Sequence, residues 1–349
     1  METLERSGPA VRFNDAQIEM SHGAGGKASR RLVEGLFVPL LANPALQALS
    51  DSATLNIKGL RLATTADGYV VKPLRFPGGS IAELAVNGTV NDLAVSGARP
   101  LGLMAAFILE AGLPGDVLRA EVEAMADAAS RAGVDIIGGD TKVVEHGLAD
   151  GMYIATFGVG EVDARADLGP ERVREGDRVL LSGPIGDHGI TILLARGELD
   201  LEAGLESDTR PLTPFVDALL ESTGEDLHWM RDPTRGGVAT ALNELVRSTD
   251  LGIVLVEEAI PLRDEVRGAC EILGLDPLHI ANEGQLIAVV AAPAADSALA
   301  AMQAIPGGER ASCIGEVRAK PSRAVIAVTS YGGSRVIDML VGDPLPRIC

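Results

Sequence analysis

The chain has 349 residues, enough for two domains that each bury a hydrophobic core. It is 46% hydrophobic, has 41 glycines and only 3% aromatic residues, a composition typical of a soluble α/β protein with many tight turns. The formal net charge of -19 argues against nucleic acid and anionic membrane as partners. We find no signal peptide and no apolar run of membrane-spanning length, and three cysteines without a CxxC pair favour the cytoplasm.

Strand and helix patterns alternate in the first half of the chain. The predicted elements are a strand at 60–65, a helix at 81–96, a strand at 101–108, a helix at 116–132 and strands at 134–137 and 152–159. Gly97 and Gly133 follow the two helices as stop signals. Gly88 lies inside the first helix, where glycine weakens a helix but permits close approach of another group. Polar residues gather where these elements end, and ligand sites tend to lie there.

The second half has the same α/β character. Strands are predicted at 178–182, 253–256 and 286–290, and helices at 190–194, 214–220, around 242–245 and at 263–273. Residues 161–176 are charged and lack apolar periodicity, so we place the domain boundary there. The predicted organisation is an extension at 1–20, an N-terminal α/β domain at 21–162, a C-terminal α/β domain at 163–340 and a flexible tail at 341–349.

Four aspartates stand at or near the ends of apolar segments, and a glycine-rich loop precedes the first helical pattern. The aspartates are Asp51, Asp67, Asp92 and Asp140, and the loop carries Gly25, Gly26 and Lys27. Carboxylates that converge from separate elements can hold Mg²⁺, and loop amides opening a helix can hold phosphate. Singly, each aspartate is better explained as a turn or helix cap, and the loop is explained equally well as a flexible turn. Together they favour a metal–triphosphate site, more for Asp67, Asp92 and Asp140 than for Asp51.

Further polar residues are candidates for the same chemistry. Lys142 and Arg235 lie in glycine-bearing segments and could contact phosphate, although a solvated surface cation is the commoner role. Asn91 adjoins Asp92 and is a candidate cofactor contact. His188 and Glu283 are candidate acid–base or orienting groups, with a structural role as the alternative for each.

The chain ends in a thiol, Cys349, which follows Pro344, Pro346 and Arg347. Proline fixes φ and lacks an amide donor, so the tail is predicted to be an extended arm. Its nine residues from Val341 could reach roughly 30 Å. In such an arm Arg347 and Cys349 would point to one side. Cys270 and Cys313 are predicted to be core residues.

These stretches accumulate into a resemblance to the HypE hydrogenase maturation family over nearly the whole chain. The motifs that carry it are His22-Gly23-Ala24-Gly25-Gly26-Lys27, Phe76-Pro77-Gly78-Gly79, Gly88-Thr89-Val90-Asn91-Asp92, Gly139-Asp140-Thr141-Lys142, Gly186-Asp187-His188-Gly189, Arg231-Asp232-Pro233-Thr234-Arg235-Gly236-Gly237, Ala281-Asn282-Glu283-Gly284 and Pro346-Arg347-Ile348-Cys349. The last is the most specific, and several others are shared with aminoimidazole ribonucleotide synthetase and its relatives. The chain departs from the family's usual residues at Arg75, Ala66, Gly68 and Gln285.

The resemblance implies an aminoimidazole ribonucleotide synthetase-like fold of two α/β (mixed α+β) domains, a homodimer through the N-terminal domains, and bound ATP and Mg²⁺. It implies an ATP-dependent carbamoyl dehydratase, a carbon–oxygen lyase. A carbamoyltransferase, HypF, would load a carbamoyl group on Cys349, and ATP would drive its dehydration to a thiocyanate. The cyano group would pass to iron on the HypC–HypD complex, as a ligand of [NiFe]-hydrogenase.

The resemblance also implies roles for single residues. The implied catalytic residues are Cys349, Lys142, Glu283 and His188. The implied cofactor contacts are Gly25, Gly26, Lys27, Asn91, Asp140 and Arg235. The implied metal ligands are Asp67, Asp92, Asp140 and Asp51.

Two other functions stay open on the sequence. A small-molecule kinase or synthetase of the same superfamily would need no terminal thiol. A non-catalytic scaffold would use the tail only for docking. ATP turnover would separate the scaffold from the two enzymes.

Overall fold

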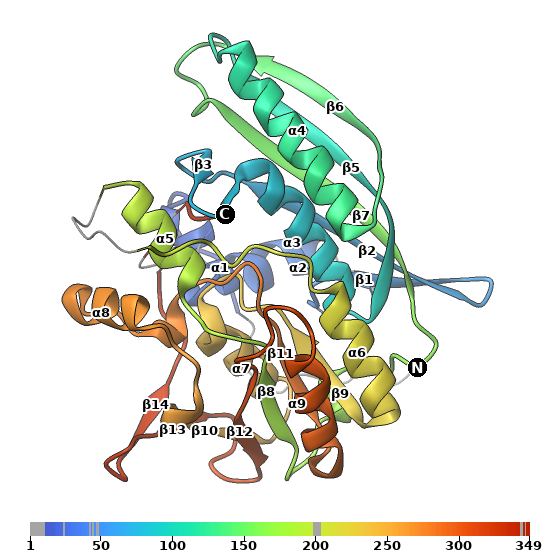
Figure 1. Ribbon diagram of the computed structural model, residues 1–349, viewed down its shortest axis with the longest axis vertical. Helices are drawn as coiled ribbons and strands as arrows, with labels where there is room; N and C mark the ends of the chain where they lie inside the picture. Colours follow the sequence, from blue (N-terminus) through green and yellow to red (C-terminus); the bar gives the residue numbers. More distant parts are fainter. Residues whose placement is uncertain are drawn as a thin grey trace.

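The computed structural model describes residues 11–23, 25–41, 43, 45–46, 49–197, 204–342, 345 and 347–349. The chain folds around two sheets, each flanked by helices, which confirms the predicted two-domain α/β fold (Figure 1). Within the described ranges, no helix is both long enough and apolar enough to cross a membrane.

The N-terminal sheet has the strand order β1-β2-β7-β5-β6. Its strands are β1 (Ala53–Ile57), β2 (Leu60–Tyr69), β5 (Ala98–Glu110), β6 (Ile136–Val144) and β7 (Met152–Val162). β5 and β6 pair in parallel, and the other neighbours are antiparallel. Helix α3 (Ile81–Val95) packs against β2, β5 and β7, and α4 (Gly115–Ala132) packs on α3. The two helices therefore cover one face of the sheet.

Helix α3 is the central element of the molecule. The Ser80 hydroxyl accepts a hydrogen bond from the Glu83 amide and caps its first turn. Nearly every residue of α3 is buried, as expected for a helix covered on all sides. A Cβ on Gly88 would lie 2.2 Å from the Tyr69 hydroxyl oxygen, so only glycine fits there. The predicted close approach at Gly88 is confirmed.

The second sheet has seven strands, in the order β14-β13-β10-β12-β8-β11-β9. Its strands are β8 (Arg178–Leu181), β9 (Leu227–Arg231), β10 (Gly252–Val256), β11 (Ile287–Val290), β12 (Ser312–Arg318), β13 (Val325–Val328) and β14 (Ser334–Ile337). Its helices are α5 (Asp187–Ala195), α6 (Thr213–Thr223), α7 (Gly237–Arg247), α8 (Asp264–Leu273) and α9 (Ala295–Gln303). Alternate side chains of β8 and β11 enter two different cores, one with α7 and one with α6 and α9. The sheet is thus buried on both faces, as period-two alternation requires.

The N-terminal segment and the chain end meet between the two sheets (Figure 1). The segment contains η1 (Met20–Gly23), α1 (Lys27–Leu32), η2 (Val33–Phe37) and α2 (Val38–Leu40), and a small hairpin joins β3 (Arg75–Phe76) to β4 (Gly79–Ser80). Short 3-10 turns lie at η4 (Pro170–Arg172), η5 (Gly224–Asp226), η6 (Glu257–Ala259), η7 (Pro277–His279) and η8 (Ala292–Ala294). In the tail, Leu345 and Ile348 are buried in the core shared by α3 and α5.

The tail differs from the extended arm that the sequence predicted. Arg347 has φ +60°, in the left-handed region, so the tail is not extended at this residue and simple alternation of side chains fails. The Ile348 side chain is buried, and the end of the tail is docked. Pro344 and Pro346 lie outside the described residues.

Candidate active site

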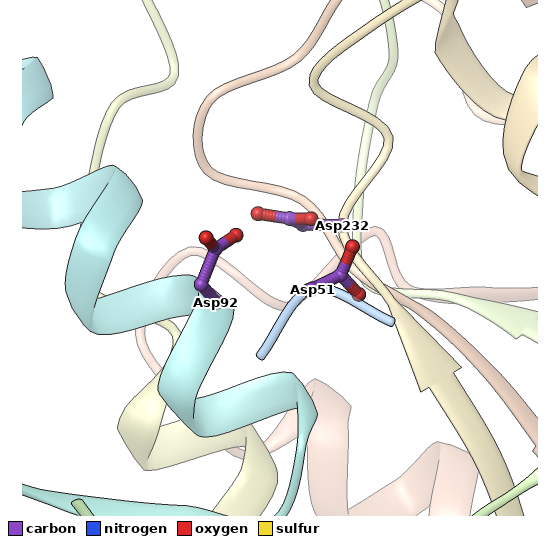
Figure 2. Close-up of side chains that lie close together, drawn as sticks. All are labelled: Asp51, Asp92 and Asp232. Atoms are coloured by element: carbon purple, nitrogen blue, oxygen red, sulfur yellow. The ribbon is translucent and has the colours of Figure 1, made fainter. Parts of the chain in front are cut away.

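Three carboxylates converge in a pocket of about 450 Å³ that is lined by both domains. They belong to Asp51, Asp92 and Asp232, and one oxygen from each lies within 4.8 Å of the others. Figure 2 shows the three side chains pointing toward one another from the segment before β1, from α3 and from the end of β9. Oxygen donors from three separate elements are the ligand set that Mg²⁺ prefers.

The negative charge of this triad is only partly balanced, because among the described residues Asp51 alone of the three forms an ion pair, with Arg231. Burial raises the pKa of Asp92 well above its usual value, and the charges of Asp232 and Asp51 raise it further. Burial, followed by the charge of Asp51, raises the pKa of Asp232 to about 8. The buried Asp232 Oδ2 has no hydrogen-bond partner among the described residues. A divalent cation would relieve both the repulsion and the unmet hydrogen bonding, so the donor set fits the metal that the family resemblance implies.

Neighbouring residues hold the triad in place. The Thr65 hydroxyl is 2.7 Å from Asp92 Oδ2 and 2.9 Å from the Asp51 carbonyl oxygen, so it links the first two ligands. Arg231 pairs with Asp51 at 2.9 Å and with Glu244 at 3.1 Å. These partners fix the orientation of the ligands before any cation is bound.

Asp67 lines the same pocket but lies outside the triad. Its Oδ1 accepts a hydrogen bond from Arg235 Nη2 at 2.9 Å, and its Oδ2 accepts one from the Tyr69 hydroxyl at 3.1 Å. The negative charge of Cys349 raises the pKa of Arg235 above its usual value, opposed by burial and supported by Asp67. Arg235 therefore stands between the acidic pocket and the chain end.

The glycine loop approaches this site but uses its amides internally. Gly25 has φ +77°, and a Cβ on it would lie 2.4 Å from the Arg235 Cβ. The amide of Gly25 donates to Ser29 Oγ, and the amide of Lys27 donates to the Leu340 carbonyl oxygen at 2.8 Å. The Lys27 side chain pairs with Asp338 at 2.6 Å. In this conformation the predicted phosphate loop, including Gly26, holds the start of the tail.

Glu283 is buried beside the same charges. Burial raises its pKa well above the usual value, with further contributions from Asp232 and Asp208, while Arg235 opposes them. Its Oε1 has no hydrogen-bond partner among the described residues. A carboxyl group in this environment is a strong base when it is ionised and can return a proton when it is neutral.

His188 binds the tail. It is fully buried, and burial lowers the pKa of its imidazole, so the ring is neutral. Its Nε2 lies 2.7 Å from the Ile348 carbonyl oxygen, which can only accept, so Nε2 carries the proton and donates. Its Nδ1 then accepts from the Ser207 hydroxyl at 2.8 Å. These contacts fit the orienting role that the sequence offered for His188, and its acid–base role stays a prediction.

Asn91 also has a structural role. Its side-chain nitrogen donates to the carbonyl oxygens of Arg210 and Glu283, at 3.0 Å and 3.2 Å, and its oxygen accepts from the Leu212 amide at 2.7 Å. These bonds join α3 to the second domain and use both ends of the amide. Asn91 is therefore a bridge between the domains in this structure, and its cofactor contact stays a prediction.

Asp140 and Lys142 are not brought to the pocket by this chain. Both are exposed on the edge strand β6 and pair with each other at 2.6 Å. The sequence predicted a strand only at 134–137, because the glycines and polar residues that follow hide its continuation. Backbone pairing with β5 extends β6 to Val144.

Asp232 and Arg231 are site residues that the sequence analysis did not assign. Asp232 directly follows β9, the same position at a strand end that drew attention to other aspartates. β9 itself was not predicted. The motif around Asp232 was recognised as a family signature, and that was the available signal.

Two family models match the chain. Residues 49–162 match the AIR synthase related protein N-terminal domain, and residues 174–328 match the corresponding C-terminal domain. The fold and the acidic pocket thus define a two-domain protein of the AIR synthase related class.

The more specific relatives narrow this class. Carbamoyl dehydratase HypE of Bradyrhizobium diazoefficiens is 49% identical over 332 residues, 95% of this chain and 96% of the relative. A solved structure of HypE in complex with ATP has a TM-score of 0.80 at 44% identity and covers 95% of this chain and 100% of that one. A HypE–HypF complex gives a TM-score of 0.84 at 43% identity, covering 88% and 99%. The chain belongs to the carbamoyl dehydratase HypE family of hydrogenase maturation proteins. The predicted resemblance and the assignment as an enzyme of this type are confirmed.

Proposed function

We propose that this protein catalyses the ATP-dependent dehydration of an S-carbamoyl group on its own Cys349 to a thiocyanate. The observation that carries the proposal is the docked chain end, whose charge acts on Arg235 beside the acidic pocket. A relative solved with ATP supports the nucleotide, and a relative solved with HypF supports a HypF-type protein as the carbamoyl donor. A substrate thiol needs a reducing compartment, so we place the reaction in the cytoplasm.

In this reaction ATP supplies a phosphoryl group that turns the amide oxygen into a good leaving group. Asp51, Asp92 and Asp232 would hold Mg²⁺ against the phosphates, and Asp67 remains a further candidate ligand. Arg235 would balance the negative charge that gathers near Cys349.

The proposed dehydration proceeds in two steps, phosphorylation of the carbamoyl oxygen and loss of phosphate. The carbamoyl oxygen bonds to the γ-phosphorus, ADP leaves, and one N–H proton is lost. The C–O bond then breaks, phosphate leaves with its electrons, and loss of the second N–H proton completes the C≡N bond. We assign a proton-accepting role to Glu283, whose raised pKa makes its carboxylate a stronger base. The cyano group would then pass to iron on a HypC–HypD acceptor.

We also propose that the protein is a homodimer through the open face of its N-terminal sheet. The face exposes Met104, Ile137 and Phe157, and patches of this kind mark interfaces. Thr65 and Ala66 line both this face and the acidic pocket. In such a dimer the second copy could bring its Asp140 and Lys142 to the edge of the pocket, where their predicted roles would apply.

Mass analysis of the C-terminal peptide tests the proposed reaction. After loading by a carbamoylating partner, ATP should reduce the mass of the peptide ending in Cys349 by one water. Cys349→Ala should keep nucleotide binding and form no thiocyanate. A carbamoyl group found on Cys270 or Cys313, or thiocyanate from the Ala variant, would overturn the assignment.

A further inference from the structure

A closed ring of polar contacts connects the docked tail to the two domains. It consists of Arg196 at the end of α5, Lys72 after β2, Asp150 before β7, and Arg347 in the tail; we call these four residues the clasp. Arg196 Nε donates to the Lys72 carbonyl oxygen at 2.7 Å, and Arg196 Nη2 donates to the Arg347 carbonyl oxygen. Lys72 Nζ lies 3.2 Å from Asp150 Oδ1, and Arg347 Nη2 lies 2.7 Å from Asp150 Oδ2. The ring thus joins both domains to the tail.

The clasp acts two residues from the sulfur. Next to it, the Val70 amide donates to a backbone oxygen of Cys349 at 3.0 Å, and Arg347 Nε donates to the Val70 carbonyl oxygen at 3.4 Å. Arg347 takes up a left-handed conformation, which costs free energy in a residue other than glycine and needs compensating contacts. The ion pair with Asp150 and the bond from Arg196 are such contacts.

The clasp differs from the other tail contacts in its exposure to solvent. The side chains of Asp150 and Arg347 are each one-third exposed, whereas Ile348 and the His188 ring are buried. Hydrogen bonding by Arg347 lowers the pKa of Asp150, so the pair is ionised at neutral pH. An exposed ion pair is weak and is screened by salt. The clasp is therefore a contact whose strength can be changed without disturbing the buried core.

We propose that Asp150 and Arg196 are positioning residues that set how often the tail undocks and exposes Cys349 to a modifying partner. The reasoning rests on the docked tail, and its link to carbamoyl loading rests on the proposed function. In a pre-equilibrium, a weaker clasp raises the exposed population of the thiol. Both the chemical reactivity of Cys349 and its loading by a partner rise by the same factor.

Alkylation of Cys349 by iodoacetamide, followed on the C-terminal peptide by mass spectrometry, tests the clasp without any catalysis. Asp150→Asn should speed alkylation roughly two- to fivefold, the range expected for loss of an exposed ion pair. Asp250→Asn is the matched control, since Asp250 forms an exposed pair at 2.8 Å with Arg323, a residue that also has positive φ. The control should alkylate Cys349 at the wild-type rate.

Two further readouts separate a clasp from a general loss of structure. High salt should bring the wild-type rate up to that of Asp150→Asn and leave the variant unchanged. The double variant with Arg347→Gln should react no faster than the faster single variant, because both changes remove one pair. Equal alkylation of wild type and Asp150→Asn, or full additivity in the double variant, would overturn the clasp.

A final measurement links the clasp to the reaction. Loading of Cys349 by a carbamoylating partner should rise in Asp150→Asn by the same factor as alkylation. Faster alkylation with unchanged loading would overturn the role in partner access. If alkylation responds but loaded wild-type protein forms no thiocyanate with ATP, the clasp stands and the proposed function fails.

Discussion

At the scale of single residues, the acidic groups of the pocket separate into two kinds. Asp51, Asp92 and Asp232 face one another, and of these three only Asp51 has an ion pair among the described residues, with Arg231. Asp67 is instead neutralised by Arg235 and held by Tyr69. Asp92 and Asp232 have no cationic partner among the described residues, whereas Asp67 is paired with Arg235.

Replacing Asp232 by Asn tests the triad. The change keeps the shape of the side chain and removes the charge of one of three proposed ligands, so Mg²⁺ affinity should fall by at least the roughly 10- to 100-fold that loss of an outer-shell partner costs. Isothermal titration with Mg²⁺, with and without ATP, measures this. Asp167→Asn, an exposed aspartate paired with Arg172 at 3.3 Å, is the control and should bind as wild type. Undiminished Mg²⁺ binding by Asp232→Asn would remove this residue from the site.

The buried carboxyl of Glu283 gives stability a pH dependence. Burial raises its pKa in the folded state well above the usual value for a glutamate, so the folded state holds a proton that the unfolded state releases. The free energy of unfolding therefore falls as pH rises above about 4.5, until the folded group has itself ionised.

Glu283→Gln should remove this fall, because Gln resembles the neutral form and cannot ionise. Thermal unfolding between pH 5 and pH 9, without metal or nucleotide, should show a smaller loss of Tm in the variant. Single-turnover thiocyanate formation should drop by roughly 100-fold or more, as for loss of an acid–base group. Wild-type turnover by Glu283→Gln would exclude the proton-accepting role.

At the scale of elements, the sequence predicted helices that depend on local signals better than strands that depend on long-range pairing. The bounds of α3 and α4 could be predicted, because apolar periodicity and terminal glycines report on the helix itself. Gly133, for example, has the left-handed conformation that ends α4. β9 and the full length of β6 could not be predicted, because these strands form only by pairing with strands distant in the sequence.

The difference between local signals and long-range pairing also explains which residues of the candidate site could be predicted. Asp51 and Asp92 were among the predicted metal ligands, but Asp232 depended on recognising β9 as a strand. Asn91 and His188 stand in motifs that invite a catalytic interpretation. Only the packing of α3 on the second domain and of the tail on α5 reveals their contacts with backbone groups.

The glycine loop allows a paired test of backbone geometry. Gly25→Ala places a Cβ against Arg235 at a residue with positive φ, so it should cost about 1–2 kcal/mol in strain and displace the guanidinium. ATP turnover should fall several-fold, and thermal unfolding should report the lost stability. Gly23→Ala is the matched control, since its Cβ would meet no atom within 4 Å. Equal behaviour of the two variants would contradict a close contact between the loop and Arg235.

At the scale of the whole molecule, the two faces of the N-terminal sheet are unequal. One face lies under α3, and the other leaves Met104 and Phe157 about half exposed, at 48% and 45%. The sequence indicated a dimer through the apolar strands of the first domain together with the family resemblance. Which strand face is open depends on where the helices pack.

Phe157→Glu tests the proposed dimer. A charge in the middle of an apolar interface should weaken association by roughly 30-fold or more, the effect of losing a central interface residue. Light scattering at micromolar concentration should show wild-type dimer and variant monomer. Val122→Glu, on the exposed side of α4 and itself 47% exposed, should remain dimeric. A wild-type monomer in this range would refute the proposed assembly.

The bonds from the amides of Lys27 and Ala28 to the carbonyl oxygens of Leu340 and Val341 fasten the chain to α1 just before the tail. Beyond them only eight residues, 342–349, lead to the thiol. Fully extended, they span roughly 26–29 Å, so the sulfur moves within a small sphere around a point on the body of the enzyme. A modifying enzyme must bring its own catalytic centre inside that sphere. In the proposed reaction, the entrance to that catalytic centre must therefore lie close to the surface through which the modifying enzyme contacts the region of α1.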